Sequence, residues 1–163
     1  MLTSTQLENL NALIDGLSKS GQDVPTSVSQ LPDFPYADYS SLMVDFKAQN
    51  AWLLRFSGAM DPSLLSMLGS GGARLKSNAG MLLTTGGPIV ALVCGFVFSW
   101  WFLIAIPVCL YWGFSLTKRA YDRAIFDAAF SNEVAFCFLY FIRQVSLRIL
   151  GTDRQIYYGQ DDT

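Results

Sequence analysis

The chain has 163 residues, of which 52% are hydrophobic, 14% aromatic and only 15% charged. This charged fraction lies well below the roughly 25% of an ordinary globular protein. The net charge of −2 excludes the strongly basic footprint of a nucleic-acid-binding domain. There is no histidine, so the usual general base and the commonest metal ligand are missing.

Catalytic and ligand-binding motifs are also absent from the sequence. It has no GxSxG, HExxH or GxGxxG pattern. Its three cysteines, Cys94, Cys109 and Cys137, are isolated in apolar runs, where thiols are inert rather than nucleophilic. We therefore expect no enzymatic activity, no catalytic residues, no cofactor and no metal site.

Residues 1–73 are predicted to form a polar, acidic helical arm with three basic and seven acidic residues. Thr5 and Glu8 fit a capping box at the start of a first helix. Leu7, Leu10, Ile14 and Leu17 then share one helical face, and Gly21 follows the expected end of the helix. Residues 1–30 have no apolar core, so we expect no signal peptide.

Residues 22–37 are predicted to be a linker because Pro25, Pro32 and Pro35 forbid regular helix. The linker and its border carry Phe34, Tyr36 and Tyr39. These aromatic side chains suit either a docking epitope for a partner or a plug onto the chain's own domain.

Two further helices are expected in the N-terminal arm. One runs from about Asp38 or Ser40 to Phe56, with apolar residues at helical spacing. A short third helix opens at Asp61-Pro62, an N-cap followed by proline at the first helical position, and ends at Gly69. Residues 69–72, GSGG, are predicted to be a flexible joint.

The most informative segment of the chain lacks Asp, Glu, Lys and Arg from Ser77 to Thr117. A bilayer core of about 30 Å needs roughly 20 helical residues, so this segment is long enough for two spans with a short turn. A single tilted span from Pro88 to Leu116, kinked at Pro107, is the alternative.

The spacing of small residues favours two antiparallel spans, at about 81–99 and 102–117. Small residues every four positions let helix backbones approach closely. The phase of this spacing slips across Trp100-Trp101, and tryptophan prefers the membrane–water interface. Gly86-Gly87-Pro88 is an irregularity inside the first span that this prediction does not explain. The predicted helix-packing residues are Gly87, Ala91, Gly95, Ser99, Ala105, Cys109 and Gly113.

Basic residues flank both ends of the apolar segment. Those in the juxtamembrane segment 74–80 and after the second span tend to stay on the cytoplasmic side of a membrane. Positive flanks at both ends require an even number of crossings, so both termini are predicted to be cytoplasmic. The residues that carry this topology are Arg74, Lys76, Trp100, Trp101, Lys118, Arg119 and Arg123.

Residues 118–150 are predicted to form a C-terminal helix that packs on the N-terminal arm and ends at Gly151. Its apolar stretch 124–142 raises the alternative of a third span. Asp127 and Glu133 make insertion unfavourable because each costs up to about 3 kcal/mol near a span's centre. Residues 151–163 are expected to be a polar tail.

Together these observations predict an all-α integral protein of the inner membrane. A transmembrane hairpin would carry a small cytoplasmic helical domain built from both arms. The expected function is a structural or adaptor subunit within a larger membrane assembly, of the kind found in bacterial secretion and conjugation machines, by analogy of architecture only. Its partners would be lipid, other membrane or cytoplasmic proteins or a second copy, and not nucleic acid. An inhibitor or immunity protein with one protein partner, and a homo-oligomeric pore, are the alternatives.

Overall fold

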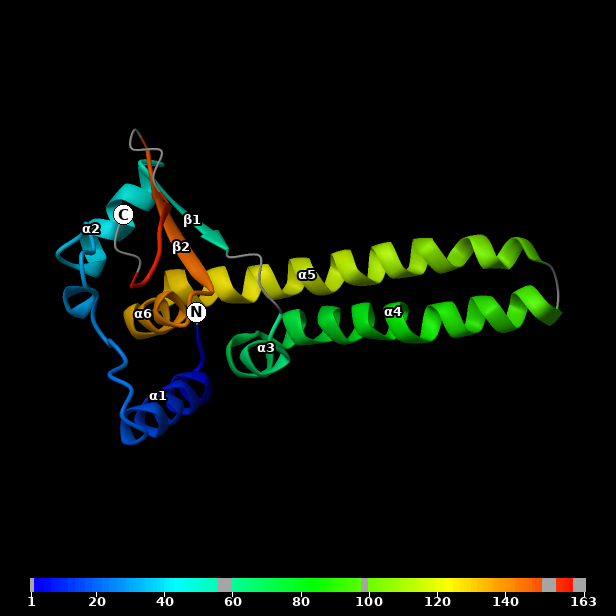
Figure 1. Ribbon diagram of the computed structural model, residues 1–163, viewed down its shortest axis with the longest axis horizontal. Helices are drawn as coiled ribbons and strands as arrows, with labels where there is room; N and C mark the ends of the chain where they lie inside the picture. The colour runs from blue at the N-terminus through cyan, green and yellow to red at the C-terminus, as the bar shows by residue number, and fades with distance from the viewer. Residues whose placement is uncertain (1, 56–59, 98–99, 151–154, 160–163) are drawn as a thin grey trace. The chain divides into compact units, whose positions relative to one another are not determined.

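The computed structural model describes residues 2–55, 60–97, 100–150 and 155–159, and the chain is mostly helical (Figure 1). It divides into two compact units: a head unit, Met1–Ala59 with Ile125–Thr163, and a hairpin unit, Met60–Ala124. The elements in chain order are α1 (Ser4–Lys19), η1 (Val28–Gln30), α2 (Tyr39–Lys47), β1 (Ala51–Arg55), α3 (Pro62–Leu68), α4 (Gly71–Val97), η2 (Trp100–Ile104), α5 (Ala105–Ser131), α6 (Glu133–Phe141), β2 (Val145–Ile149) and β3 (Gln155–Ile156).

The head unit contains an antiparallel sheet that the all-α prediction lacked. Its strand order is β1-β2-β3, with Leu53 opposite Leu147. β1 lies where the second helix was expected to continue to Phe56, and β2 lies where the C-terminal helix was expected to continue to residue 150. Both of these helix extents are wrong. The sheet also takes in Gln155–Ile156, within the predicted polar tail.

Each of the two mispredicted helices ends in a left-handed residue that is not glycine. Gln49 after α2 has φ 60° and Arg143 after α6 has φ 56°. In both cases the next amide nitrogen bonds back to a carbonyl one turn earlier, Asn50 to Asp45 at 2.9 Å and Gln144 to Leu139 at 2.9 Å. This is the Schellman pattern, which normally uses glycine, and it turns the chain directly into a strand.

The N-terminal helix begins two residues earlier than its expected capping box. Thr3 is the N-cap and Gln6 closes the box, with the Thr3 backbone N–H donating to Gln6 Oε1 at 2.9 Å. The predicted pair Thr5 and Glu8 lies inside the helix instead. Gln supports the same reciprocal bonding as Glu, so both pairs fit the sequence pattern. Leu10 and Ile14 are buried as their spacing predicts.

The core of the head unit is centred on α6. Every residue from Ala135 to Tyr140 is buried, which explains why this stretch is apolar all round. Asn132 interrupts the helical run by capping α6, and its Oδ1 accepts from the Val134 amide at 2.8 Å. Glu133 bonds the amide of Val28 in η1 at 2.9 Å. The apolar stretch 124–142 is thus interrupted at Asn132 and contains the hydrogen-bonded carboxylate of Glu133. Its last part, α6, is a core helix of the head unit.

The hairpin unit begins with α3, whose Asp61 cap, first-turn Pro62 and exit at Gly69 match the prediction. Of the predicted joint 69–72, Gly71 and Gly72 already belong to α4. α4 continues through Pro88 without interruption. α4 and the first part of α5 run antiparallel and side by side, connected through η2 (Figure 1).

Candidate functional site

The hairpin formed by α4 and α5 contains two helical stretches long and apolar enough to cross a membrane, Gly71–Val97 and Trp100–Ser131. Large apolar side chains cover its outside along the whole charge-free segment. Phe96 is 83% exposed and Tyr111 72% exposed. A water-soluble protein rarely exposes apolar surface on this scale. The other exposed apolar side chains of this surface are Leu82, Ile89, Val90, Val93, Val97, Val108, Leu110, Trp112 and Phe114.

The backbones of the two helices come into close contact where Gly80 of α4 meets Gly113 of α5. A Cβ placed on Gly80 would lie 2.8 Å from the Gly113 carbonyl oxygen and would overlap Thr117 Oγ1. A Cβ on Gly113 would lie 2.7 Å from the Gly80 carbonyl oxygen and would overlap Thr84 Oγ1. Both contacts are closer than a real Cβ tolerates, so only glycine permits this backbone approach.

The contact has the same sequence pattern on both helices, a glycine followed four residues later by threonine. Thr84 Oγ1 donates to the Gly80 carbonyl at 2.7 Å, and Thr117 Oγ1 donates to the Gly113 carbonyl at 3.0 Å. Each hydroxyl is thereby satisfied within its own helix. The four-residue spacing of small residues predicts Gly113 but not Gly80, because Gly80 precedes Gly87 by seven residues rather than by a multiple of four. Spacings of four and seven on one helical face were the available signal.

The structure places the other predicted packing residues along the same hairpin. A Cβ on Gly87 would lie 2.9 Å from Cys109 Cβ, and one on Gly95 would lie 2.7 Å from a methyl of Leu103. Ala91 is buried and Ala105 is half-buried. Ser99 lies outside the described residues.

The predicted topology residues lie at opposite ends of the hairpin. The basic side chains lie at the end where α4 begins, because the Gly80–Gly113 contact brings residues 74–80 beside residues 117–123. We call this group the basic collar; its members are Arg74, Lys76, Lys118, Arg119 and Arg123. At the turn, the rings of Trp100 and Trp101 stack with centroids 4.4 Å apart and are 63% and 62% exposed.

The three candidate docking aromatics all make contacts within the head unit. Phe34 packs edge-on against Tyr140, with ring centroids 5.3 Å apart. Tyr39 Oη donates to the Ala129 carbonyl at 2.7 Å, and Tyr36 Oη donates to Asp45 Oδ2 at 2.9 Å. These contacts match the internal plug, and a docking role stays a prediction.

Burial perturbs several titratable groups of the head unit. It raises the pKa of Tyr39 to about 12, with the Glu133 charge adding to the effect. Burial and the bond to Asp45 raise the pKa of Tyr36 to about 12. Burial also raises the pKa of the Cys137 thiol to about 12, which keeps this sulfur protonated and unreactive.

Among the described residues, no group of three or more His, Cys, Asp or Glu side chains is placed to hold a metal ion. No protein-family model, curated protein sequence or solved structure matches this chain.

Proposed function

We propose that this protein is a membrane-anchored, non-enzymatic adaptor whose hairpin crosses the bilayer and holds the head unit on the cytoplasmic face of the inner membrane. The observation that carries the proposal is the exposed apolar surface along the hairpin, in a chain whose head unit has its own buried core. The apolar surface requires lipid or a protein partner to cover it, while the core requires neither.

The dimensions of the hairpin support a complete crossing. From Ser77, where the charge-free segment begins, α4 continues to Val97. At 1.5 Å per residue this stretch is about 30 Å long, the thickness of a bilayer's hydrocarbon core. Trp100 and Trp101 would then lie at the far interface, which their rings favour.

The basic collar supports the orientation. Five cations at one end of the hairpin favour the cytoplasmic, anionic side of a membrane, and the turn carries no charge to hold it in water. Both arms of the chain leave the hairpin at the collar end. The head unit, which combines the two arms, would therefore form on the cytoplasmic side.

The adaptor role is supported by the structural use of the side chains in the head unit and by its acidic charge. Its aromatic and carboxylate side chains are used in packing and helix capping, as at Phe34, Tyr39 and Glu133. An acidic head on a lipid anchor suits the presentation of a binding surface to other subunits. An inhibitor that binds one membrane-associated protein would share this architecture.

The pore alternative has less support. A pore needs polar groups along its lining, and the chain offers few in the charge-free segment. The hydroxyls of Thr84 and Thr85 donate to carbonyls of their own helix, at 2.7 and 2.8 Å. The donor hydrogens of these two side chains are therefore used within α4.

Reporter topology tests the membrane part of the proposal. Tags at the two termini and one inserted between Trp100 and Trp101 should report cytoplasmic termini and an external turn. Replacing Lys118, Arg119 and Arg123 by Gln should weaken this orientation, whereas replacing Lys19 and Lys47 in the head unit should not. Termini on opposite sides, or a protein that stays in solution without detergent, would disprove the hairpin anchor.

Purification in a mild detergent tests the adaptor part. We expect a stable complex that contains the protein together with at least two other proteins in fixed stoichiometry. One protein partner bound in a fixed ratio would replace the adaptor with the inhibitor, and ion conductance in liposomes would replace it with the pore.

A further inference from the structure

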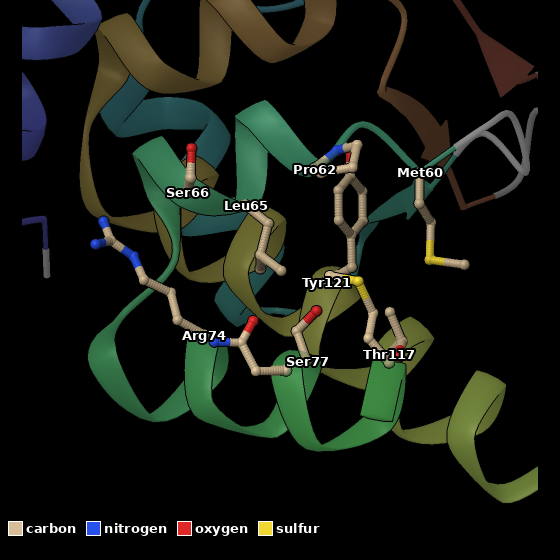
Figure 2. Close-up of a pocket in the computed structure, with 10 residues that line it drawn as sticks. Met60, Pro62, Leu65, Ser66, Arg74, Ser77, Thr117 and Tyr121 are labelled. Carbon is tan, nitrogen blue, oxygen red and sulfur yellow. The ribbon is translucent and has the colours of Figure 1, made fainter. Parts of the chain in front are cut away.

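A pocket of about 370 Å³ lies in the hairpin unit, between α3, the start of α4 and the middle of α5 (Figure 2). This volume falls at the lower end of the range of small-molecule sites. Most of its walls are apolar. They are formed by Met60, Pro62, Leu65, Met81 and the ring of Tyr121, and the polar contributors are Ser66, Arg74, Ser77, Asn78 and Thr117.

Ser77 provides an unpaired hydroxyl inside this pocket. The residue is only 1% exposed, and its Oγ has no hydrogen-bond partner within the described part of the chain. Figure 2 shows Oγ pointing from α4 toward Leu65 and Tyr121. A buried hydroxyl without a partner is unfavourable, and this one is oriented so that a group entering the pocket would be its nearest new partner.

The other polar groups of the pocket differ in what they can offer. Tyr121 Oη already accepts from the Asp61 amide at 3.2 Å, and Thr117 Oγ1 donates to the Gly113 carbonyl at 3.0 Å. Arg74 uses Nε to bond the Gly69 carbonyl at 3.0 Å. Figure 2 shows its guanidinium at the outer margin of the pocket residues, on the side away from Tyr121 and Met60.

The pocket adjoins the border between charged and charge-free sequence. Ser77 is the first residue of the segment without Asp, Glu, Lys or Arg, and Thr117 is the last. The cations of the basic collar lie at this same end of the hairpin. If the hairpin crosses the bilayer as proposed above, the pocket therefore lies at the depth of the cytoplasmic headgroups.

We propose that this pocket binds one anionic phospholipid. An acyl segment fills the space between Leu65, Met81 and Tyr121, the Ser77 hydroxyl donates to an ester carbonyl oxygen, and the phosphate lies against the Arg74 guanidinium. Apolar walls, a buried unpaired hydroxyl and one cation at the edge match the three parts of such a lipid. A free phosphate would leave the apolar space unfilled, and a zwitterionic lipid would offset its phosphate with its own cation and so pair more weakly with Arg74.

The experiment uses the full chain in a neutral detergent, with short-chain phosphatidylglycerol, short-chain phosphatidylcholine and inorganic phosphate as probes. Native mass spectrometry counts bound lipid, and thermal unfolding measures the stabilisation by each probe. We expect one tightly bound phosphatidylglycerol per chain, with weaker binding of phosphatidylcholine and none of phosphate. Equal binding of the two lipids, or protection by phosphate alone, would overturn the proposal.

Four variants separate this site from general attraction to the basic collar. Ser77→Ala should weaken phosphatidylglycerol binding about fivefold, the effect of one neutral hydrogen bond. Arg74→Gln should weaken it about tenfold, whereas Lys76→Gln removes the same charge outside the pocket and should change it little. Ser66→Trp should fill the pocket from an exposed position and abolish binding, and near-ultraviolet circular dichroism checks that each variant folds.

Equal effects of Arg74→Gln and Lys76→Gln, or none of Ser77→Ala, would show that the lipid is merely annular. This inference rests on the proposed membrane anchor, but the two fail separately. Binding in micelles does not depend on the number of crossings, and the topology reporters do not depend on the pocket.

Discussion

Gly80 and Gly113 form a reciprocal contact, in which each glycine leaves room for the other's carbonyl oxygen. A Cβ on either residue would lie 2.7 to 2.8 Å from that oxygen and would overlap a threonine hydroxyl oxygen of the opposite helix. Close backbone approach maximises packing where lipid supplies no hydrophobic driving force between helices. This contact also determines which residues of α4 and α5 lie beside each other.

The first prediction concerns this glycine pair. Gly80→Ala and Gly113→Ala should each destabilise the hairpin by about 1–3 kcal/mol, the usual cost of overpacking. Gly86→Ala is the matched control, because a Cβ there meets nothing within 4 Å. It should be neutral or stabilising by up to about 1 kcal/mol through helix propensity. Thermal unfolding in detergent measures all three, and equal midpoints would contradict the contact.

The second prediction concerns the cap of α3. Asp61 Oδ1 accepts from the Ser63 amide at 2.9 Å, and the bonds to Ser63 lower the pKa of the Asp61 carboxyl. Asp61→Ala should cost about 1 kcal/mol at neutral pH, while Asp61→Asn retains a capping oxygen and should cost less. A group with a lowered folded pKa stabilises the fold above its unfolded value of about 4.

That stabilisation should be lost as the pH falls through the lower, folded pKa. Denaturant unfolding of the three proteins at pH 7 and at about pH 3 measures this difference. If the wild type and Asp61→Ala differ as much in acid as at neutral pH, the charged cap is not the cause.

The third prediction concerns Cys137. The side chain is fully buried, and burial followed by the Glu133 charge raises the pKa of its thiol to about 12. In a variant with Cys94→Ala and Cys109→Ala, a water-soluble maleimide at pH 8 should label Cys137 about a thousandfold more slowly in the fold than in denaturant. Ser29→Cys, at an exposed position of the head unit, is the matched control and should react rapidly in both states. Rapid labelling of folded Cys137 would show that α6 is not enclosed.

The fourth prediction is a loss of stability in alkali. The pKa values of Tyr36 and Tyr39 are raised to about 12, and burial raises that of Tyr140. A raised pKa means that the folded state holds its protons above pH 10, where the unfolded tyrosines lose theirs. The head unit should therefore be destabilised as the pH rises from about 10 to about 12.

Tyr39→Phe isolates one of these groups. It removes the bond to the Ala129 carbonyl and should cost about 1 kcal/mol at neutral pH. The decline in stability above pH 10 should be shallower in this variant than in the wild type. Phenolate absorbance and denaturant unfolding measure both effects, and an unchanged alkaline slope would contradict the assignment.

Helix starts, helix ends and apolar helices depend on residues that are close together in the sequence, so they could be predicted from the sequence. The Asp61-Pro62 start and the Gly69 exit of α3 needed only local capping rules. The end of α1 was marked by Gly21, which has φ 86°. The two long apolar helices followed from the absence of charge over a long stretch.

The same helix-ending motif went unrecognised where glycine did not mark it. Gln49 and Arg143 adopt the left-handed conformation that Gly21 adopts, although their side chains disfavour it. The sheet that follows them forms because β1 and β2, separated by most of the chain, pair with each other. Neither strand alone could pair its backbone N–H and C=O groups. No local sequence pattern indicates that a partner strand exists so far away in the chain.

The amino-acid sequence by itself therefore determined the helical character, the charge-free segment and the small residues that permit close helix contact. Tertiary structure alone decided which small residues meet, that Gly80 is one of them, and that residues 51–55 and 145–149 are strands. The physical reason is the distance along the chain over which each kind of interaction acts. Propensity, capping and hydropathy act over one or two helical turns, whereas pairing and close packing are settled between segments far apart in the chain.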